Sequence, residues 1–331
     1  MSIVYGPVPS WRFGRSLGID VITPPKKCTF DCVYCQLGRK KMHVLGPEEL
    51  NQPLVDVERV LKDLEVVLKR IDLNTVDIVT FSGTGEPTLN LELDKIAKEV
   101  KRRIKDLPLA ILTNASLFHR GDVRRNLNKF DFVVAKLDAG DNDTFRSINR
   151  PADDQMDIFT IVDSIKRVKK EVRGIMALEV MLLSSKDGAI TNVDAKSRKR
   201  LLDAILEVNP DIIQVAVPYR PPSENSVRSP SWKKIKLISK ELTNIFSEDR
   251  LWIYGMHDKR GKQVTWLKHE SLEREAFNLL KRRPCRIVDV SEGLGITFSE
   301  ARALLINLEK KKFVAAEKSR GEKYYSPRLS H

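Results

Sequence analysis

Three of the four cysteines in this chain, Cys28, Cys32 and Cys35, lie within eight residues of one another. Their spacing, three residues and then two, places three thiols on one short loop directly after an apolar run. Thiolate sulfur is the ligand that iron–sulfur clusters prefer. A four-iron cluster needs four ligands, so three cysteines leave one iron open, as a catalytic metal site requires. The spacing therefore predicts a cluster with one free coordination position.

Three other interpretations of these cysteines explain the spacing less well. A structural zinc site needs a fourth Cys or His close by, whereas His43 is the nearest histidine and Cys285 lies far along the chain. Three unrelated cysteines would seldom fall at this spacing. A disulfide framework would spread its cysteines along the chain.

Several other apolar runs of the sequence end in, or are followed by, residues that could contact a ligand. Parallel strands place their ligands at the C-terminal edge of the sheet, so these residues are expected to surround one site. The candidates are Gly85, Glu86, Pro87, Thr113, Asn114, Lys136 and Asp138, with Glu179 and Met181 as weaker ones.

The elements that must position these residues alternate along the chain. Short apolar runs predict strands, and charged segments with helical spacing lie between most of them. This alternation predicts parallel strands joined by helical crossovers. The expected strands are Leu17–Ile22, Val76–Ser82, Leu109–Thr113, Phe132–Asp138, Ile175–Leu183 and Ile212–Val217, and helices are expected at Val57–Ile71, Leu91–Ile104 and Ile158–Val172.

One face of the predicted sheet should be polar. Alternate residues of a strand share a face, so Lys136 and Asp138 lie together, opposite the apolar positions 133, 135 and 137. Glu179 and Gln214 extend the polar face to the next strands. Because a parallel strand buried on both sides is apolar on both, we expect an incompletely closed barrel with a polar cavity.

The cysteine loop, with Tyr34 just before its third cysteine, resembles the signature of the radical SAM superfamily. The segment Ser82–Pro87, Ser-Gly-Thr-Gly-Glu-Pro, is similar to that family's Gly-Gly-Glu-Pro motif. The resemblance covers about residues 10–220 and implies an α/β fold with a partial (βα)6 TIM-like barrel. It also implies one [4Fe–4S] cluster on Cys28, Cys32 and Cys35, and cleavage of S-adenosylmethionine to a 5′-deoxyadenosyl radical.

The same resemblance implies roles for the other candidates at the cofactor. Gly85, Glu86 and Pro87 would hold the methionine ammonium group through backbone carbonyls, and Thr113 and Asn114 would contact the ribose or the carboxylate. Tyr34, Lys136 and Asp138 complete the expected cofactor-binding set, although a buried Lys136–Asp138 pair would serve equally well as a structural feature. No residue is assigned to the catalytic step on the substrate.

The segment Pro9–Gly18, taken with the cysteine loop, resembles a subgroup related to wyosine-type tRNA base synthases. Those enzymes carry a second cluster on three further cysteines, and only Cys285 is left in this chain. Its position at a helix start suits a small buried residue. A single cluster is therefore expected. Arg12 and Arg15 either bind an anionic substrate or anchor the N-terminus, and we favour anchoring.

The C-terminal residues have the pattern of a separate unit. We expect a radical SAM domain at 1–257, a linker at 258–270 and a small winged helix-turn-helix domain at 271–331. The pattern is three helices, the last opened by the capping box Thr297–Glu300, followed by two strands around Ser319–Gly321. Such a domain binds RNA, DNA or protein, and Arg320 at the wing tip is the best candidate phosphate contact.

The chain of 331 residues has a net charge of +13, from 58 Lys and Arg against 45 Asp and Glu. This charge suits an anionic partner, nucleic acid first, or reflects an ordinary basic surface. Because there is no signal peptide and no apolar stretch of about 20 residues, we expect no membrane association and a cytoplasmic location.

These features together predict a radical SAM enzyme that modifies a macromolecule such as tRNA and takes electrons from ferredoxin or flavodoxin. An alternative is an activase that installs a radical on a partner protein. A third interpretation, an iron–sulfur transcription regulator, is disfavoured by the Gly85–Pro87 motif, because a sensor has no need to hold methionine.

Overall fold

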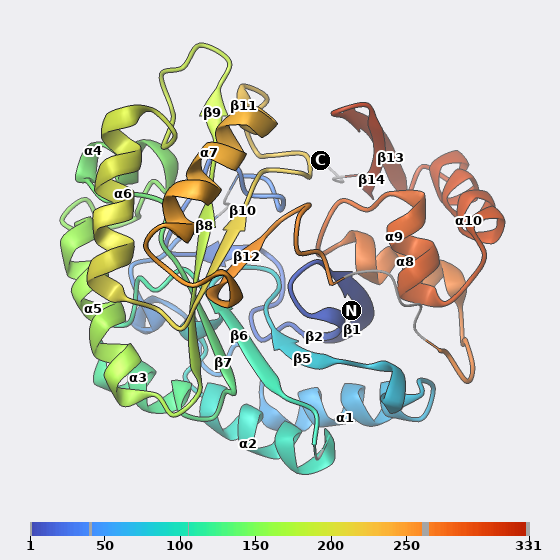
Figure 1. Ribbon diagram of the computed structural model, residues 1–331. Coiled ribbons are helices and arrows are strands. Elements are labelled where there is room, and N and C mark those ends of the chain that lie inside the picture. Colours follow the sequence, from blue (N-terminus) through green and yellow to red (C-terminus); the bar gives the residue numbers. More distant parts are fainter. Residues whose placement is uncertain (1, 40–41, 105, 260–264, 329–331) are drawn as a thin grey trace.

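The computed structural model describes residues 2–39, 42–104, 106–259 and 265–328. Within these ranges the central element is an eight-stranded sheet that curls into an open half-barrel (Figure 1). All neighbouring strands are parallel except the first pair, which is an antiparallel hairpin. In sheet order they are β1 (Val4–Ser10), β2 (Gly14–Ile19), β5 (Ile78–Phe81), β6 (Leu109–Thr113), β7 (Phe132–Lys136), β8 (Ile175–Met181), β10 (Ile212–Ala216) and β12 (Leu251–Ile253).

Helices cover the outer face of this sheet (Figure 1). Four of them begin after an aspartate, at positions 56, 141, 157 and 194, whose carboxylate accepts a backbone N–H of the first turn. Their apolar sides pack on the outward-facing residues of the strands in one core. The helices are α1 (Val57–Leu68), α2 (Leu93–Ile104), α3 (Gly121–Leu127), α4 (Asn142–Ile148), α5 (Ile158–Glu171), α6 (Ala195–Val208) and α7 (Trp232–Thr243).

The inward face of the sheet has two layers. Near the N-terminal ends of the strands it is apolar, with Phe13 packed on Ile78, Ala110, Val134 and Ala177. One step towards the C-terminal ends, four strands have polar inward positions: Thr80, Glu179 and Gln214 are buried, and Lys136 is half-buried. The predicted polar face is thus confirmed for the C-terminal layer only.

The β1–β2 hairpin closes the open side of the half-barrel. Its tip reaches across the sheet, where the ring of Phe13 meets Trp252 of β12 edge-on at 5.9 Å between centroids. Two residues after Phe13, Arg15 donates to both oxygens of Asp77, at 3.0 and 2.8 Å. The anchoring role expected for Arg15 is therefore confirmed.

The C-terminal residues form α8 (Leu272–Leu280), α9 (Ile287–Leu294), α10 (Phe298–Lys310) and the hairpin β13 (Val314–Ser319) and β14 (Glu322–Pro327). Helix α10 begins with the predicted capping box, in which Thr297 N donates to Glu300 at 2.8 Å. Tyr5 and Val8 of β1 share one apolar core with these helices. The C-terminal helices accordingly lie beside the N-terminal strands in Figure 1. Part of the expected linker, 260–264, lies outside the described residues.

Short elements complete the described part of the chain. They are β3 (Lys27–Cys28), β4 (Met42–His43), β9 (Ser184–Ser185), β11 (Val227–Arg228) and the 3-10 turns Pro47–Glu49, Leu73–Thr75, Pro87–Leu89 and Glu248–Arg250. In the portion that the structure describes, no helix combines the length and the apolar character needed to cross a bilayer.

Candidate active site

Each cysteine sulfur of the loop accepts a hydrogen bond from a different side chain. The three donors come from the residue before the loop, from the end of β6 and from the residue after α4. The donor–sulfur distances are 3.2 Å for Lys26 Nζ to Cys35, 3.6 Å for Asn114 Nδ2 to Cys28, and 3.5 Å for Asn149 Nδ2 to Cys32. Hydrogen bonds to the sulfurs are a feature of metal-bound thiolates and tune the potential of iron–sulfur clusters.

The electrostatics of the loop favour a bound cation. Burial raises the pKa of Cys28 and raises that of Cys32 to about 11. Burial alone lowers the pKa of Lys26, but the sulfurs, Cys35 foremost, raise it above its ordinary value. Thiolates here need positive charge close by, which Lys26 and iron would both supply, so the donor set fits a cluster.

Among the residues that the structure describes, no three His, Cys, Asp or Glu side chains are arranged to hold a metal ion together. In a cluster, each cysteine binds a different iron, so the sulfurs need not converge on one point.

The Gly85 segment is hydrogen-bonded to the start of the cysteine loop. Lys27 N donates to Thr84 O at 3.3 Å, and Glu86 N donates to Lys27 O at 3.0 Å. Gly85 has φ +146°, and a Cβ atom at this position would lie 1.7 Å from the Lys27 carbonyl oxygen. Only glycine permits this approach, which brings the two sequence motifs into contact.

The side chain of Glu86 is buried and links neighbouring segments through hydrogen bonds. It is 2% exposed, and burial raises its pKa. Its carboxylate accepts from Thr113 Oγ1 at 2.5 Å, from Asn114 N at 2.7 Å and from Thr88 Oγ1 at 2.6 Å. Glu86 therefore joins the end of β5 to the end of β6 and turns Asn114 towards the cysteine loop. Pro87 follows as the first residue of the 3-10 turn.

Lys136 pairs with Glu179, at 3.2 Å between Nζ and Oε1, and Arg12 binds the same carboxylate. Burial alone raises the pKa of Glu179, and these two cations lower it below its ordinary value. Lys136 also lies over the ring of Tyr34, 4.9 Å from its centroid. The buried pair considered for Lys136 and Asp138 is thus formed by Lys136 and Glu179, because these residues are cross-strand neighbours.

Asp138 holds the cysteine loop in place through hydrogen bonds to Tyr34 of the loop and to Asn149. Its carboxylate accepts from the Tyr34 hydroxyl, from Asn149 Nδ2 at 2.8 Å and from Met181 N at 2.8 Å. Burial raises the pKa of Tyr34 well above its ordinary value, so its hydroxyl stays protonated and donates. The structure therefore places Asp138 behind Tyr34.

Two adjoining cavities, of about 230 and 240 Å³, lie at the C-terminal end of the half-barrel. They share five lining residues: Arg12, Gln36, Leu112, Tyr219 and Arg220. The first is also lined by Tyr34, Cys35, Lys136 and Glu179, and the second by Gly83, Gly85, Arg282 and Arg283. Six of the predicted candidates line this composite site: Tyr34, Cys35, Gly85, Lys136, Glu179 and Met181. The other candidates do not line either cavity; they are Cys28, Cys32, Glu86, Pro87, Thr113, Asn114 and Asp138. The C-terminal unit contributes Arg282 and Arg283 to the wall.

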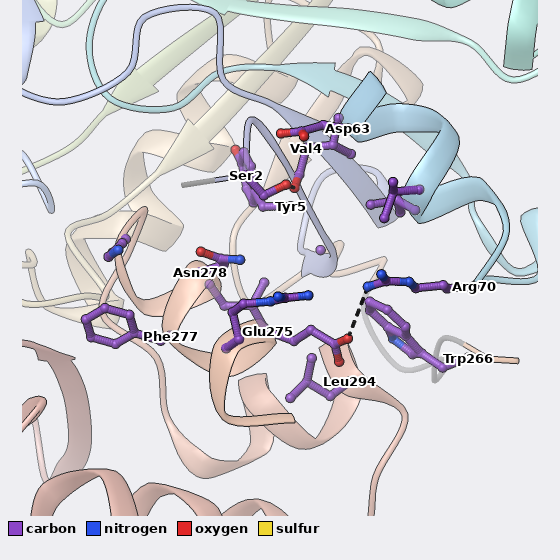
Figure 2. Close-up of a pocket in the computed structure, with 16 residues that line it drawn as sticks. Ser2, Val4, Tyr5, Asp63, Arg70, Trp266, Glu275, Phe277, Asn278 and Leu294 are labelled. Carbon is purple, nitrogen blue, oxygen red and sulfur yellow. Dashed lines mark hydrogen bonds and ion pairs between the residues drawn. The ribbon is translucent and has the colours of Figure 1, made fainter. Parts of the chain in front are cut away.

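A larger cavity, of about 510 Å³, lies away from the cysteine loop, between β1, α1 and α8 (Figure 2). Its charged groups already have partners. Arg274 pairs with Glu270 at 2.5 Å, and the ammonium group of Lys281 lies over the Phe277 ring, 4.5 Å from its centroid. Arg70 pairs with Glu275 at 3.8 Å, and Asp63 accepts from Ile3 N at 2.6 Å. This cavity is a gap at the contact between the barrel and the C-terminal helices.

Sequence reasoning missed three residues of the site. Lys26 directly precedes the cysteine loop, so its proximity was a usable signal. Asn149 is 117 positions from Cys32, and Arg283 lies in the C-terminal unit, so no local pattern indicates either.

Comparison with known proteins agrees with this geometry. A model of the radical SAM superfamily matches residues 22–185. The UPF0026 protein MJ1312 of Methanocaldococcus jannaschii is 36% identical over 248 residues, which cover 75% of this chain and 72% of that protein. The UPF0026 protein slr1464 of Synechocystis is 36% identical over 218 residues, covering 66% and 76%.

Among solved structures, Streptococcus suis SuiB bound to S-adenosylmethionine matches 76% of this chain and 51% of that chain, with 17% identity and a TM-score of 0.48. The chain belongs to the UPF0026 family within the radical SAM superfamily, whose enzymes use a [4Fe–4S] cluster and S-adenosylmethionine.

Proposed function

We propose that this enzyme holds one [4Fe–4S] cluster through Cys28, Cys32 and Cys35. The observation that carries the proposal is the separate N–H donor on each of the three sulfurs. When bound, the cluster supplies the electron that cleaves S-adenosylmethionine to a 5′-deoxyadenosyl radical.

S-Adenosylmethionine would occupy the composite cavity, with its methionine end beside Gly85. The carbonyls of Glu86 and Pro87 already accept from Leu89 and Asn90 in the 3-10 turn, at 3.2 and 3.1 Å. Gly85 is therefore the best placed of the three to receive the ammonium group.

The other predicted cofactor contacts divide into two kinds. Tyr34 and Lys136 line the cavity and would contact the ligand directly. The second kind does not line the cavity but holds the surrounding segments in place. These residues are Thr113, which binds Glu86, Asn114, which binds Thr29 of the cysteine loop, and Asp138, which binds Tyr34.

The substrate we propose is a nucleic acid, with tRNA first. The net charge of +13 supports an anionic partner. The cavity walls support it further, because five cationic side chains line the two cavities against one carboxylate, Glu179. Ferredoxin or flavodoxin would supply the electrons.

We propose the division 1–257, 258–270 and 271–331 for the chain, with the last part as a winged helix-turn-helix unit that contacts the substrate. Its order of three helices and a two-stranded hairpin supports this assignment. Arg320 lies in the exposed turn of this hairpin. The hairpin contacts the barrel beside the composite cavity, because the Tyr324 hydroxyl donates to Tyr219 O at 2.7 Å and Tyr219 lines both cavities. An RNA bound at the cavity would therefore lie near the C-terminal unit.

The test is anaerobic turnover of the reconstituted enzyme with dithionite and S-adenosylmethionine, with and without bulk tRNA. We expect tRNA to stimulate formation of 5′-deoxyadenosine several-fold, and Cys28→Ala to abolish it. Unchanged turnover with tRNA, together with no RNA in the purified protein, would remove the RNA assignment. Stimulation by a partner protein instead would support the activase.

A further inference from the structure

We propose that Arg220 and Arg283 hold a phosphate group of the substrate in the cavity between the barrel and the C-terminal unit. This inference rests on the proposed function, because it assigns the substrate contacts of that same site.

The cavity that contains Gly85 is strongly basic. Of the residues lining it, four are arginines and none is a carboxylate; the arginines are Arg12, Arg220, Arg282 and Arg283. Two of them have partners, because Arg12 binds Glu179 and Arg282 lies 3.5 Å from Asp20. Within the described ranges, Arg220 and Arg283 have no carboxylate within 4 Å.

Both of these arginines have buried nitrogens without an acceptor among the described residues. In Arg283, which is 9% exposed, Nε and Nη2 are unpartnered, while Nη1 donates to Pro9 O at 3.2 Å. In Arg220, Nε has no acceptor among the described residues, while Nη1 donates to Gln36 Oε1 at 3.1 Å and to the Tyr219 hydroxyl at 2.5 Å. A buried charged donor without an acceptor is costly, and a bound anion would satisfy these groups.

One carboxylate, Asp289, lies behind the two arginines. It is 2% exposed, and although burial alone raises its pKa, Arg220 first among the nearby charges lowers it to about 2. Asp289 is already hydrogen-bonded to Arg286, with 3.2 Å between Nε and Oδ2. A single carboxylate shared among three guanidinium groups leaves positive charge facing the cavity.

A phosphate fits this arrangement better than a carboxylate. Phosphate carries up to two charges and three acceptor oxygens, so it can bind two guanidinium forks at once. S-Adenosylmethionine has one carboxylate and is a cation overall, so it does not neutralise the cavity. Trp11, which is 1% exposed, also lines the cavity, and its Nε1 has no acceptor among the residues that the structure describes.

The position of the cavity suits a substrate site. Gln36 and Gly85 line it, so a phosphate held there lies beside both the cysteine loop and the proposed methionine site. Arg283 comes from the C-terminal unit, whereas Arg220 follows β10. The C-terminal unit would therefore complete the substrate site.

The test is isothermal titration of the cluster-loaded enzyme with S-adenosylmethionine present, anaerobically and at fixed ionic strength. The probes are uridine 5′-monophosphate, uridine, malonate and a uridine decanucleotide. We expect the monophosphate to bind at least about ten-fold more tightly than uridine or malonate. Arg220→Gln and Arg283→Gln should each remove about ten-fold of this affinity.

The matched control is Arg167→Gln, which removes the same charge from the exposed face of α5 and should change nothing. If the decanucleotide binds more tightly than the monophosphate through the same arginines, the phosphate belongs to RNA; the reverse order indicates a free nucleotide. Both orders support the site.

Equal binding of the monophosphate, uridine and malonate would overturn the inference, as would unchanged binding in both arginine variants. If a variant fails to fold, the comparison of the three small probes on the unmodified enzyme still shows whether the cavity prefers a phosphate. The cluster spectrum and 5′-deoxyadenosine formation test the proposed function separately. If the cluster spectrum and 5′-deoxyadenosine formation are intact but phosphate does not bind, the phosphate site is refuted and the proposed function stands.

Discussion

The residues around the cysteine loop show how a protein tunes a metal site with its own side chains. Lys26 is 7% exposed and donates to Cys35 Sγ and to the carbonyl of Gly38, at 3.2 and 2.6 Å. A buried cation beside a thiolate favours the more negative state of whatever the thiolate binds. Lys26 should therefore stabilise the reduced cluster.

We predict that Lys26→Met lowers the reduction potential of the cluster by an amount on the order of tens of millivolts. Lys26→Arg, which keeps the charge, should restore most of the difference. The measurement is a redox titration followed by electron paramagnetic resonance. Equal potentials in the two variants and the unmodified enzyme would show that Lys26 serves only to fold the loop.

Among the elements, the β1–β2 hairpin has the clearest architectural role. Phe13 packs edge-on against Phe132 and Trp252, at 5.5 and 5.9 Å between ring centroids. It therefore links a central strand to the edge strand β12 across the half-barrel and forms the apolar floor beneath the polar layer.

We predict that Phe13→Ala lowers the free energy of unfolding by about 3 kcal/mol, because it removes a large buried side chain and leaves a cavity. Phe159→Ala, at a position that is 60% exposed on α5, should change it by less than about 0.5 kcal/mol. Urea denaturation measures both. A Phe13 variant as stable as the control would mean that the hairpin tip does not close the barrel.

Helix α9 contributes a pH-dependent contact through Asp289. Since the pKa of this carboxylate falls from an ordinary 3.8 to about 2 in the folded protein, its stabilisation is present above about pH 4 and is lost as the pH falls towards 2. We predict that Asp289→Asn costs about 2 kcal/mol at pH 7.

The cost of Asp289→Asn should shrink when unfolding is measured at successively lower pH, down to about 3. The exposed variant Asp203→Asn on α6 is the control and should show no such trend. A difference from the unmodified protein that stays constant between pH 7 and 3 would exclude the charge of Asp289 as its source.

The elements also show what sequence patterns can and cannot predict. Six strands of the sheet were predictable, because each is a short, mostly apolar run between charged segments with helical spacing. Strand β1 was not, because Gly6, Pro7 and Pro9 break its pattern. The ion-pair partner of Lys136 was also missed. Glu179 is 43 positions away in sequence, and the two residues are neighbours only because β7 and β8 pair in that register.

At the scale of the whole molecule, the two parts of the chain are joined by a shared core. Tyr5 and Val8 of β1 pack with the C-terminal helices, and the Tyr324 hydroxyl donates to Tyr219 O at 2.7 Å. Parts that share buried surface of this kind unfold together.

We predict a single heat-capacity peak in scanning calorimetry of the intact protein without cluster. Two resolved peaks would show instead that residues 271–331 fold independently of the barrel. Tyr5→Ala should lower the temperature of the single peak, whereas in an uncoupled molecule it would shift only one of the two.

The most direct test of the central claim is electron paramagnetic resonance of the anaerobically reconstituted, dithionite-reduced enzyme before and after S-adenosylmethionine is added. We predict the signal of one reduced [4Fe–4S] cluster per chain, and a change in that signal on addition, because the open iron gains a ligand. Cys28→Ala, Cys32→Ala and Cys35→Ala should each lose it, whereas Cys285→Ala should keep it. Stable zinc in place of iron, or a cluster signal that S-adenosylmethionine leaves unchanged, would contradict the account.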